Sequence, residues 1–100
     1  MNPIDVALIC KSLSDANRLQ IVQLLTGGEM CACRLLEHFQ ITQPTLSHHM
    51  RVLSECGLIE SRREGKSTFY QLNCDTLTAF RSFIDSLSCH RCCGKGKTEP

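Results

Sequence analysis

Apolar residues recur at helical spacing along most of the chain and predict five helices. These helices are expected within residues 4–11, 12–28, 31–39, 43–55 and 75–88. Before the last of them, strand-like residues 58–59 and 69–72 flank the charged segment RREGK, which predicts a β-hairpin. The fold is therefore expected to be mainly α with one β-hairpin. One domain would span residues 1–88, and a flexible cysteine-containing tail would span residues 89–100.

Residues that start and stop helices support these boundaries. Ser14 or Asp15 can cap the second helix, and the glycine pair that follows it ends that helix. Thr42 is a good N-cap for the fourth helix. Pro44 falls in the first turn of the same helix, where its missing N–H costs nothing.

Two short helices joined by a tight turn and followed by a hairpin form a winged helix-turn-helix. In the fourth helix, Leu46, Met50 and Leu53 repeat at i, i+4 and i+7 and predict a buried stripe. The remaining face is expected to be exposed and carries only hydrogen-bonding side chains: Gln43, Thr45, Ser47, His48, His49 and Arg51. Such groups suit base edges and phosphates, so we expect this face to bind double-stranded DNA.

The predicted hairpin adds basic side chains beside this helix. Arg62, Arg63 and Lys66 surround Gly65 and are expected to reach phosphates or a minor groove. The net charge of the chain is only +1. DNA binding therefore depends on where the charges lie and not on their sum.

The composition argues against a membrane protein and against a disulfide-stapled domain. No apolar run reaches the ~18 residues that a membrane span requires, and the N-terminus MNPIDVALIC has no basic leader. We therefore expect a cytoplasmic protein. Eight cysteines in 100 residues would suit a secreted scaffold, but the dense Leu and Ile pattern is that of a packed core. Cys10, Cys56 and Cys74 stand alone and are expected to be buried apolar residues.

Cys31 and Cys33 flank a single alanine at the predicted start of the third helix. Side chains two positions apart on a regular helix point about 200° away from each other. Two thiolates that share one ion need their sulfurs within about 4 Å, so the first turn would have to bend or unwind. The helix dipole at this end also favours the thiolate. This pair is the first candidate metal site. Bending of the first turn of the third helix would shift the fourth helix, the expected DNA-recognition helix, because the third helix is expected to pack directly behind it.

A second thiol cluster, CHRCC, lies at the start of the tail. Cys89 and Cys92 have CxxC spacing, Cys93 is adjacent, and His90 is a borderline ligand. Three thiols in a flexible segment can surround a trigonal ion without strain. The tail is therefore the second candidate metal site, and incidental thiols in a disordered tail are the alternative.

Three segments resemble the arsenic-responsive (ArsR/SmtB) family of bacterial metalloregulatory repressors. They are SLSDANRLQIVQLL, EMCACRLL and TQPTLSHHMRVLSECGLIESRREGKSTFYQL, in the order and spacing of that family. The resemblance covers about residues 4–88 and implies a winged-helix homodimer formed through the first and last helices. The apolar stripe of the last helix fits such an interface independently.

The same resemblance implies a repressor that leaves an inverted-repeat operator when arsenite or antimonite binds Cys31 and Cys33. Some members of the family carry a third cysteine where this chain has Leu36. A hydroxide, an outside thiol, Cys10 or the tail can complete the site instead. Zinc-sensing members place Asp and His ligands along the last helix, and this chain has no His there before His90.

The sequence leaves other functions open. Thiolate-rich sites also bind cadmium or lead, and a disulfide-forming pair on the same fold would be a redox sensor. A small thiol oxidoreductase would place its CxxC at a helix N-terminus in a βαβ frame, whereas here the CxxC follows a helix. We therefore expect no enzyme, and a non-DNA interaction module is the remaining alternative.

Overall fold

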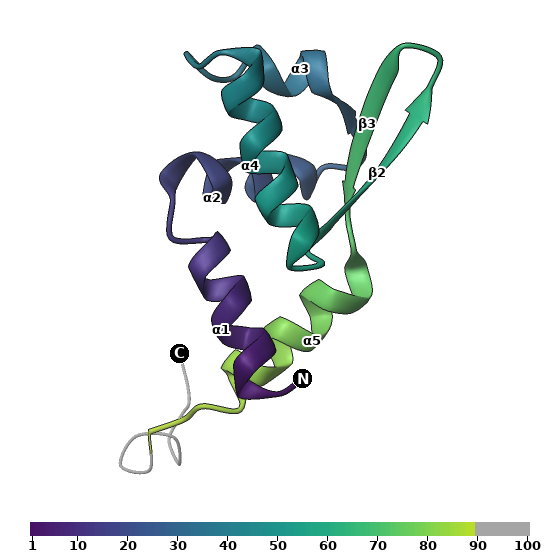
Figure 1. Cartoon of the computed structure of the whole chain (residues 1–100). Helices are drawn as coiled ribbons and strands as arrows, with labels where there is room; N and C mark the ends of the chain where they lie inside the picture. The colour runs from purple at the N-terminus through teal and green to yellow at the C-terminus, as the bar shows by residue number, and fades with distance from the viewer. Residues whose placement is uncertain (90–100) are drawn as a thin grey trace.

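The computed structural model describes residues 1–89 and confirms a mainly helical chain with a β-hairpin (Figure 1). Its elements in chain order are α1 (Pro3–Ser12), α2 (Ala16–Leu25), β1 (Met30–Cys31), α3 (Ala32–Leu36), α4 (Gln43–Glu55), β2 (Ile59–Glu64), β3 (Ser67–Leu72) and α5 (Cys74–Asp85). The first, second, fourth and last predicted helices are present near their expected ends. Most of the tail lies outside the described residues.

Side-chain caps fix where the long helices begin. Asp15 accepts a hydrogen bond from the backbone N–H of Asn17 at 2.8 Å at the start of α2. Thr42 accepts one from the N–H of Thr45 at 3.3 Å at the start of α4. Each bond satisfies an N–H that has no partner inside its helix, so both predicted caps are confirmed.

One hydrophobic core joins the helices to the hairpin. Its fully buried side chains come from α1, α2, α3, α4 and the segment leading into β2: Ile9, Ile21, Leu35, Met50, Leu53 and Leu58. The predicted stripe of α4 is confirmed, because Leu46, Met50 and Leu53 are at most 2% exposed. The core therefore holds α4 by one face only.

A three-stranded antiparallel sheet with strand order β1-β3-β2 replaces the simple hairpin of the prediction. Strands β2 and β3 run longer than expected and pair from Ile59↔Leu72 to Glu64↔Ser67. Strand β1 was not predicted; it pairs through Met30↔Tyr70 and Cys31↔Phe69. We call β2, β3 and their connecting turn the wing.

Helix α3 is shorter than predicted and starts one residue later. Cys31 has extended dihedral angles, φ −78° and ψ 155°, because it belongs to the strand that pairs with β3. The helix ends after Leu36, where the N–H groups of His38 and Phe39 bond to carbonyls three residues back. A tighter turn therefore replaces the expected last part of the helix.

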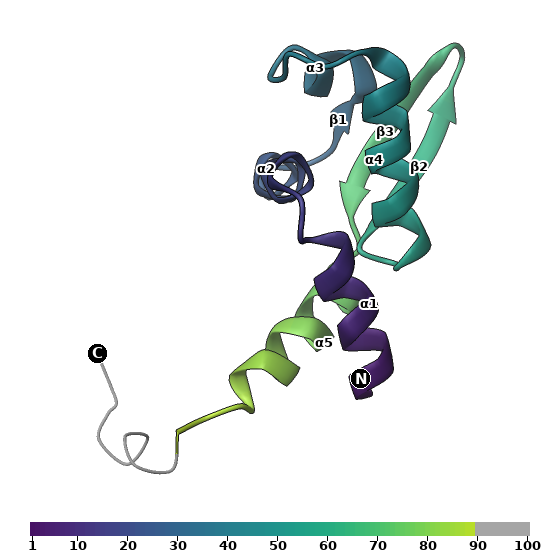
Figure 2. The same ribbon diagram turned by 60° about the vertical axis from the view of Figure 1, so that its left-hand side comes forward.

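Helices α1 and α5 lie side by side at the end of the molecule away from the wing tip (Figure 2). None of the residues of α5 is buried. Large apolar side chains on and next to these two helices remain exposed: Ile4, Leu8, Ile84 and Leu87. In residues 1–89, no helix has the length and apolar character that a membrane span requires.

Candidate nucleic-acid interface and thiol site

The outer face of α4 is polar, as the sequence predicts, and the helix lies beside the wing (Figure 1). Five of the six predicted side chains are exposed: Gln43, Thr45, Ser47, His48 and Arg51. No carboxylate precedes Glu55 in this helix. The face can therefore approach a polyanion with donors and acceptors that suit base edges.

His49 corrects the prediction, because its residue is only 6% exposed and faces the interior. A helix turns about 100° per residue, which places position 49 on the flank of the stripe formed by positions 46, 50 and 53. The His49 Nδ1 atom lies 3.1 Å from Nη1 of Arg18, and Arg18 Nε donates to the carbonyl of Ser12. His49 therefore joins α4 to the start of α2.

Burial lowers the pKa of His49, the carboxylate of Asp15 opposes this effect, and the positive charge of Arg18 lowers the pKa further. Guanidinium groups only donate hydrogen bonds, so Nδ1 must be the unprotonated acceptor. His49 is thus held neutral on the buried side of α4.

Arg62 also differs from its predicted position at the hairpin tip. It lies in β2 and forms a two-pronged ion pair with Glu29, with both N···O distances 2.8 Å. Its guanidinium carbon lies 4.5 Å from the centre of the Phe69 ring, and Nη1 bonds to Glu64 at 3.3 Å. The two carboxylates raise the pKa of Arg62 and satisfy its charge within the protein.

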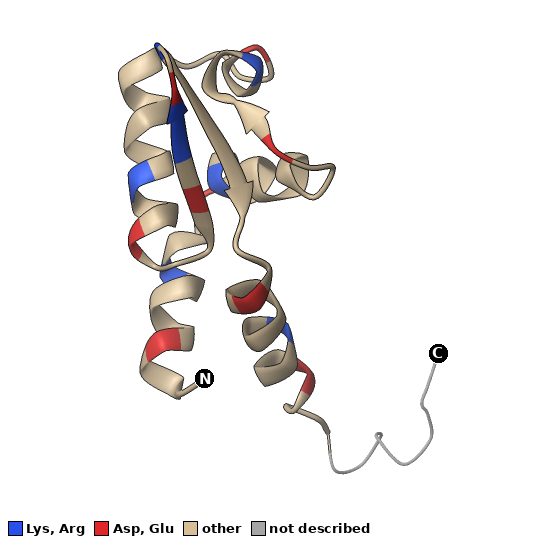
Figure 3. Cartoon of the chain, turned by 90° about the vertical axis from the view of Figure 1, so that its right-hand side faces the viewer, with Lys and Arg blue, Asp and Glu red and all other residues tan. Residues whose placement is uncertain are grey.

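Arg63 and Lys66 remain the basic residues at the wing tip, where Gly65 turns the chain with φ 62°. Both side chains belong to exposed residues. Figure 3 shows basic and acidic positions close together along the hairpin beside a basic position on α4. The tip therefore offers fewer available cations than the sequence suggested.

The thiol pair is already assembled where β1 meets α3. The Sγ atoms of Cys31 and Cys33 lie 2.7 Å apart. Cys31 is the extended N-cap residue of α3 and Cys33 is the second residue of the helix. The sulfurs therefore meet because Cys31 lies outside the helix in extended conformation, as expected if a regular first turn cannot bring them together.

The two thiols are electrostatically unequal. The pKa of Cys31 is lowered, chiefly by the hydrogen bond from the Cys33 thiol and then by the backbone N–H of Arg34. The pKa of Cys33 is raised, because its proton is shared with the Cys31 sulfur. Cys31 is thus the better thiolate, and thiolates are the nucleophiles and metal ligands of cysteine.

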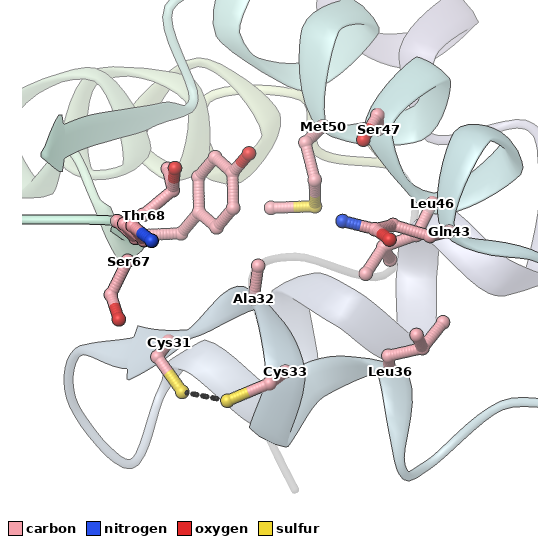
Figure 4. Close-up of a pocket in the computed structure, with 12 residues that line it drawn as sticks. Cys31, Ala32, Cys33, Leu36, Gln43, Leu46, Ser47, Met50, Ser67 and Thr68 are labelled. Atoms are coloured by element: carbon pink, nitrogen blue, oxygen red, sulfur yellow. Dashed lines mark hydrogen bonds between the residues drawn. The ribbon is translucent and has the colours of Figure 1, made fainter.

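A cleft of about 250 Å³ separates the thiol pair from α4. It is lined by residues of β1, α3, α4, the turn of the wing and β3, among them Cys31, Cys33, Ser47, Met50 and Lys66. In Figure 4 Ala32 points into this cleft, whereas the two sulfurs point toward each other on the opposite side. The cleft therefore lies between the start of α3 and α4, while Leu35 of α3 belongs to the same core cluster as Leu46 and Met50 of α4.

The other cysteines occupy varied environments. Cys10 and Cys74 are exposed, contrary to the expectation of burial, and Cys56 is half-buried with its Sγ 3.2 Å from the Ser12 hydroxyl. Among residues 1–89, no group of three His, Cys, Asp or Glu side chains could hold a metal ion. In the second thiol cluster, Cys89 is the last described residue, and Cys92 and Cys93 lie outside the described residues.

Sequence reasoning missed two positioning residues. Arg18 holds His49, and Glu29 holds Arg62. Neither belongs to a periodic pattern or a motif that signals its partner, because each interaction joins positions more than 30 residues apart. Only the three-dimensional arrangement reveals them.

Known proteins with similar sequences and structures are transcriptional regulators. Residues 15–61 match the model of the family described as bacterial regulatory protein, arsR family. The chain is 54% identical to an arsenical resistance operon repressor of Staphylococcus aureus over 69% of this chain and 66% of that protein. It is 46% identical to a protein of the same name from Staphylococcus xylosus over 84% and 81% of the two chains.

The fold is similar to that of a homodimeric winged helix-turn-helix DNA-binding domain from Mycobacterium bovis. The TM-score is 0.69 and the sequence identity 30%, over 82% of this chain and 77% of the other. The predicted winged helix-turn-helix is therefore confirmed.

Proposed function

Since the chain belongs to the ArsR family of bacterial regulatory proteins, we propose that it is a repressor that arsenite or antimonite releases from its operator by binding Cys31 and Cys33. The observation that carries this proposal is the assembled thiol pair, with its sulfurs 2.7 Å apart beside the strand that pairs with the wing. The similarity to arsenical resistance repressors supports arsenic as the effector.

The chemistry of the pair suits a trivalent arsenic or antimony centre. Arsenous acid condenses with two thiols, forming two As–S bonds and releasing two water molecules. Cys31, whose pKa is lowered, attacks first as the thiolate, and the neighbouring Cys33 thiol closes the ring. A hydroxide or an outside thiol holds the third position.

The DNA-binding half of the proposal assigns separate roles to α4 and the wing. The exposed side chains of α4 enter a major groove and read base edges, while Arg63 and Lys66 contact phosphates. The similar Mycobacterium bovis domain is homodimeric, and a homodimer of this chain formed through α1 and α5 presents two copies of α4 about one helical turn apart. The operator is then an imperfect inverted repeat.

An arsenite titration of the operator complex tests the proposal. Wild-type protein should bind arsenite, with a thiolate-to-arsenic absorption band, and should leave a labelled operator fragment. Cys31→Ser and Cys33→Ser should keep operator binding and lose release, because a single thiolate cannot chelate the ion. Cys74→Ser, which removes an exposed cysteine at the start of α5, is the matched control and should behave as wild type.

Sensing by the second thiol cluster is the main alternative that the titration can reveal. If both single variants still release DNA on arsenite addition, the Cys31–Cys33 pair is not the sensor. Loss of release in a triple Cys→Ser variant at positions 89, 92 and 93 would then assign sensing to the tail. Release of the operator by cadmium or lead, but not by arsenite, would identify a different soft ion as the effector.

Redox sensing is the second candidate function, and the 2.7 Å distance between the sulfurs favours it. Peroxide would oxidise the two thiols to a disulfide and would itself be reduced to water. Anaerobic addition of arsenite should release DNA under the first function, and peroxide without arsenite should do so under the second.

A further inference from the structure

The thiol site is joined to the wing more directly than to α4. Cys31 pairs with Phe69 of β3, and Met30 pairs with Tyr70, so backbone hydrogen bonds link the site to the wing. Helix α3 also lies against β1 and β3. On its α4 side, by contrast, the start of α3 borders the cleft of about 250 Å³. A displacement of the thiols is therefore transmitted to the wing more directly than to α4.

A side-chain contact reinforces this link across one face of the sheet, over the central strand β3. Glu29 stands two residues before Cys31, and both of its carboxylate oxygens accept hydrogen bonds from Arg62 of β2 at 2.8 Å. The same guanidinium covers the Phe69 ring at 4.5 Å. Arg62 thus contacts the loop that precedes the site and the residue that pairs with Cys31. Bidentate Arg–carboxylate pairs fix relative orientation as well as adding energy.

We propose that the Glu29–Arg62 ion pair transmits occupancy of the thiol site to the wing and thereby sets how strongly the effector weakens DNA binding. The inference rests on the function proposed above. Two thiolates on one ion with bonds near 2.3 Å stand about 3.5–4 Å apart, so an ion bound between Cys31 and Cys33 sets the separation of their sulfurs. Cys31 belongs to β1, so a displacement of Cys31 on binding strains the pairing of β1 with β3. Glu29 and the β1–β3 pairing carry that displacement to the strand beside Arg63 and Lys66.

The variant Glu29→Gln tests this role without altering a thiol or a proposed DNA contact. It keeps the shape of the side chain and removes its charge. Glu60→Gln is the matched control, because Glu60 is also an exposed carboxylate in the sheet, but it bonds to Gln71 and Asn73 and not to the loop before β1. Operator affinity is measured by fluorescence anisotropy with and without saturating arsenite, and arsenite affinity is measured on the free proteins.

Wild type and Glu60→Gln should lose operator affinity about 100-fold with arsenite, a typical allosteric coupling. For Glu29→Gln we expect a loss of only about tenfold, with arsenite affinity of the free protein unchanged. Its operator affinity without arsenite should be equal to or higher than that of wild type, since Arg62 becomes available to phosphate. The swapped pair Glu29→Arg with Arg62→Glu should restore most of the coupling.

Wild-type protein that fails to bind arsenite would overturn the proposed function, and this inference with it. If Glu29→Gln binds arsenite and releases the operator as completely as wild type does, this inference alone is overturned. Equal loss of coupling in Glu60→Gln would also overturn it, because the effect would then not depend on the contact between the loop before β1 and Arg62. Weaker arsenite binding by free Glu29→Gln would assign Glu29 to the ion site instead.

Discussion

At the scale of single residues, His49 and Arg62 show how a polar side chain near a binding face can serve the protein interior. Both side chains can form hydrogen bonds with DNA, and both are engaged by other side chains here. His49 accepts from Arg18 beneath α4, and Arg62 is paired with two carboxylates. Their substitutions should therefore act through position and stability.

Replacing His49 with Ala should lower the free energy of unfolding at pH 7.5 by about 1–3 kcal/mol, because it removes a hydrogen bond to the charged guanidinium of a half-buried arginine. The donor in question is Arg18, which is 3.1 Å from the imidazole. His48→Ala, which changes the exposed neighbour, should have little effect. Urea denaturation followed by circular dichroism measures both. A fully stable His49→Ala variant would contradict the anchoring role.

The wild-type protein should also lose stability as the pH falls below about 6.5. The pKa of His49 is lowered in the folded state from its ordinary value of 6.5. The unfolded chain therefore binds the proton first, and linkage makes stability fall with pH from 6.5 down to the folded pKa. His49→Gln cannot titrate and should flatten the curve between pH 7.5 and about 5.5. An equally steep curve in this variant would assign the dependence to other groups.

Sequence reasoning separated the buried and exposed residues of α4 by side-chain type, and His49 is where this rule fails. Position 49 lies about 60° from position 46 around the helix, inside the width of a normal apolar face. A buried polar residue needs a partner, and that partner, Arg18, comes from another helix. The angle between positions 46 and 49 argues against full exposure of His49, but only the structure identifies Arg18 as its partner.

At the scale of elements, α4 and the wing should make separable contributions to DNA binding. Ser47→Ala removes an exposed hydroxyl from α4 and should weaken operator binding more than binding to random DNA, by about 1–3 kcal/mol if the hydroxyl contacts a base. Equal losses on both DNAs, measured by anisotropy, would show that Ser47 contacts only the phosphate backbone.

Contacts between the wing and DNA phosphates should appear in the salt dependence of DNA affinity. Lys66→Ala should weaken binding to operator and random DNA alike and reduce the slope of log K against log salt by about 1. Arg62→Ala should leave that slope unchanged, since the Arg62 charge is already paired with Glu29 and Glu64. A reduced slope for Arg62→Ala would mean that the ion pair opens on DNA.

Elements with strong local signals were predicted well, and elements defined by long-range pairing were not. The start of α4 follows from Thr42 and Pro44 in the sequence, and its apolar stripe repeats over the full helix. Strand β1 contains only Met30 and Cys31, too few residues for any periodicity. It exists because β3 pairs with it. The same pairing extends Cys31 and delays α3, so the missed strand and the misplaced helix start have one cause.

At the scale of the whole molecule, the described chain has two ends with different surfaces. The wing and α4 form a polar end, while α1 and α5 form an end where Ile4 is 74% and Leu87 65% exposed. Exposed apolar side chains on two adjacent helices are typical of an interface. A two-fold interface at that end would leave both copies of α4 and the wing free for DNA.

Ile84→Glu should therefore break the proposed dimer without unfolding the chain, because Ile84 is 43% exposed and lies outside the core. Sedimentation equilibrium should show a dimer for wild type and a monomer for the variant at micromolar concentration. Operator affinity should fall at least about tenfold, since a monomer occupies one half-site. Leu19→Glu is the matched control: Leu19 is 49% exposed but lies on α2, and its variant should remain dimeric. If Ile84→Glu stays dimeric and binds the operator like wild type, α5 is not the interface, and the spacing of the two α4 helices must be set by another surface.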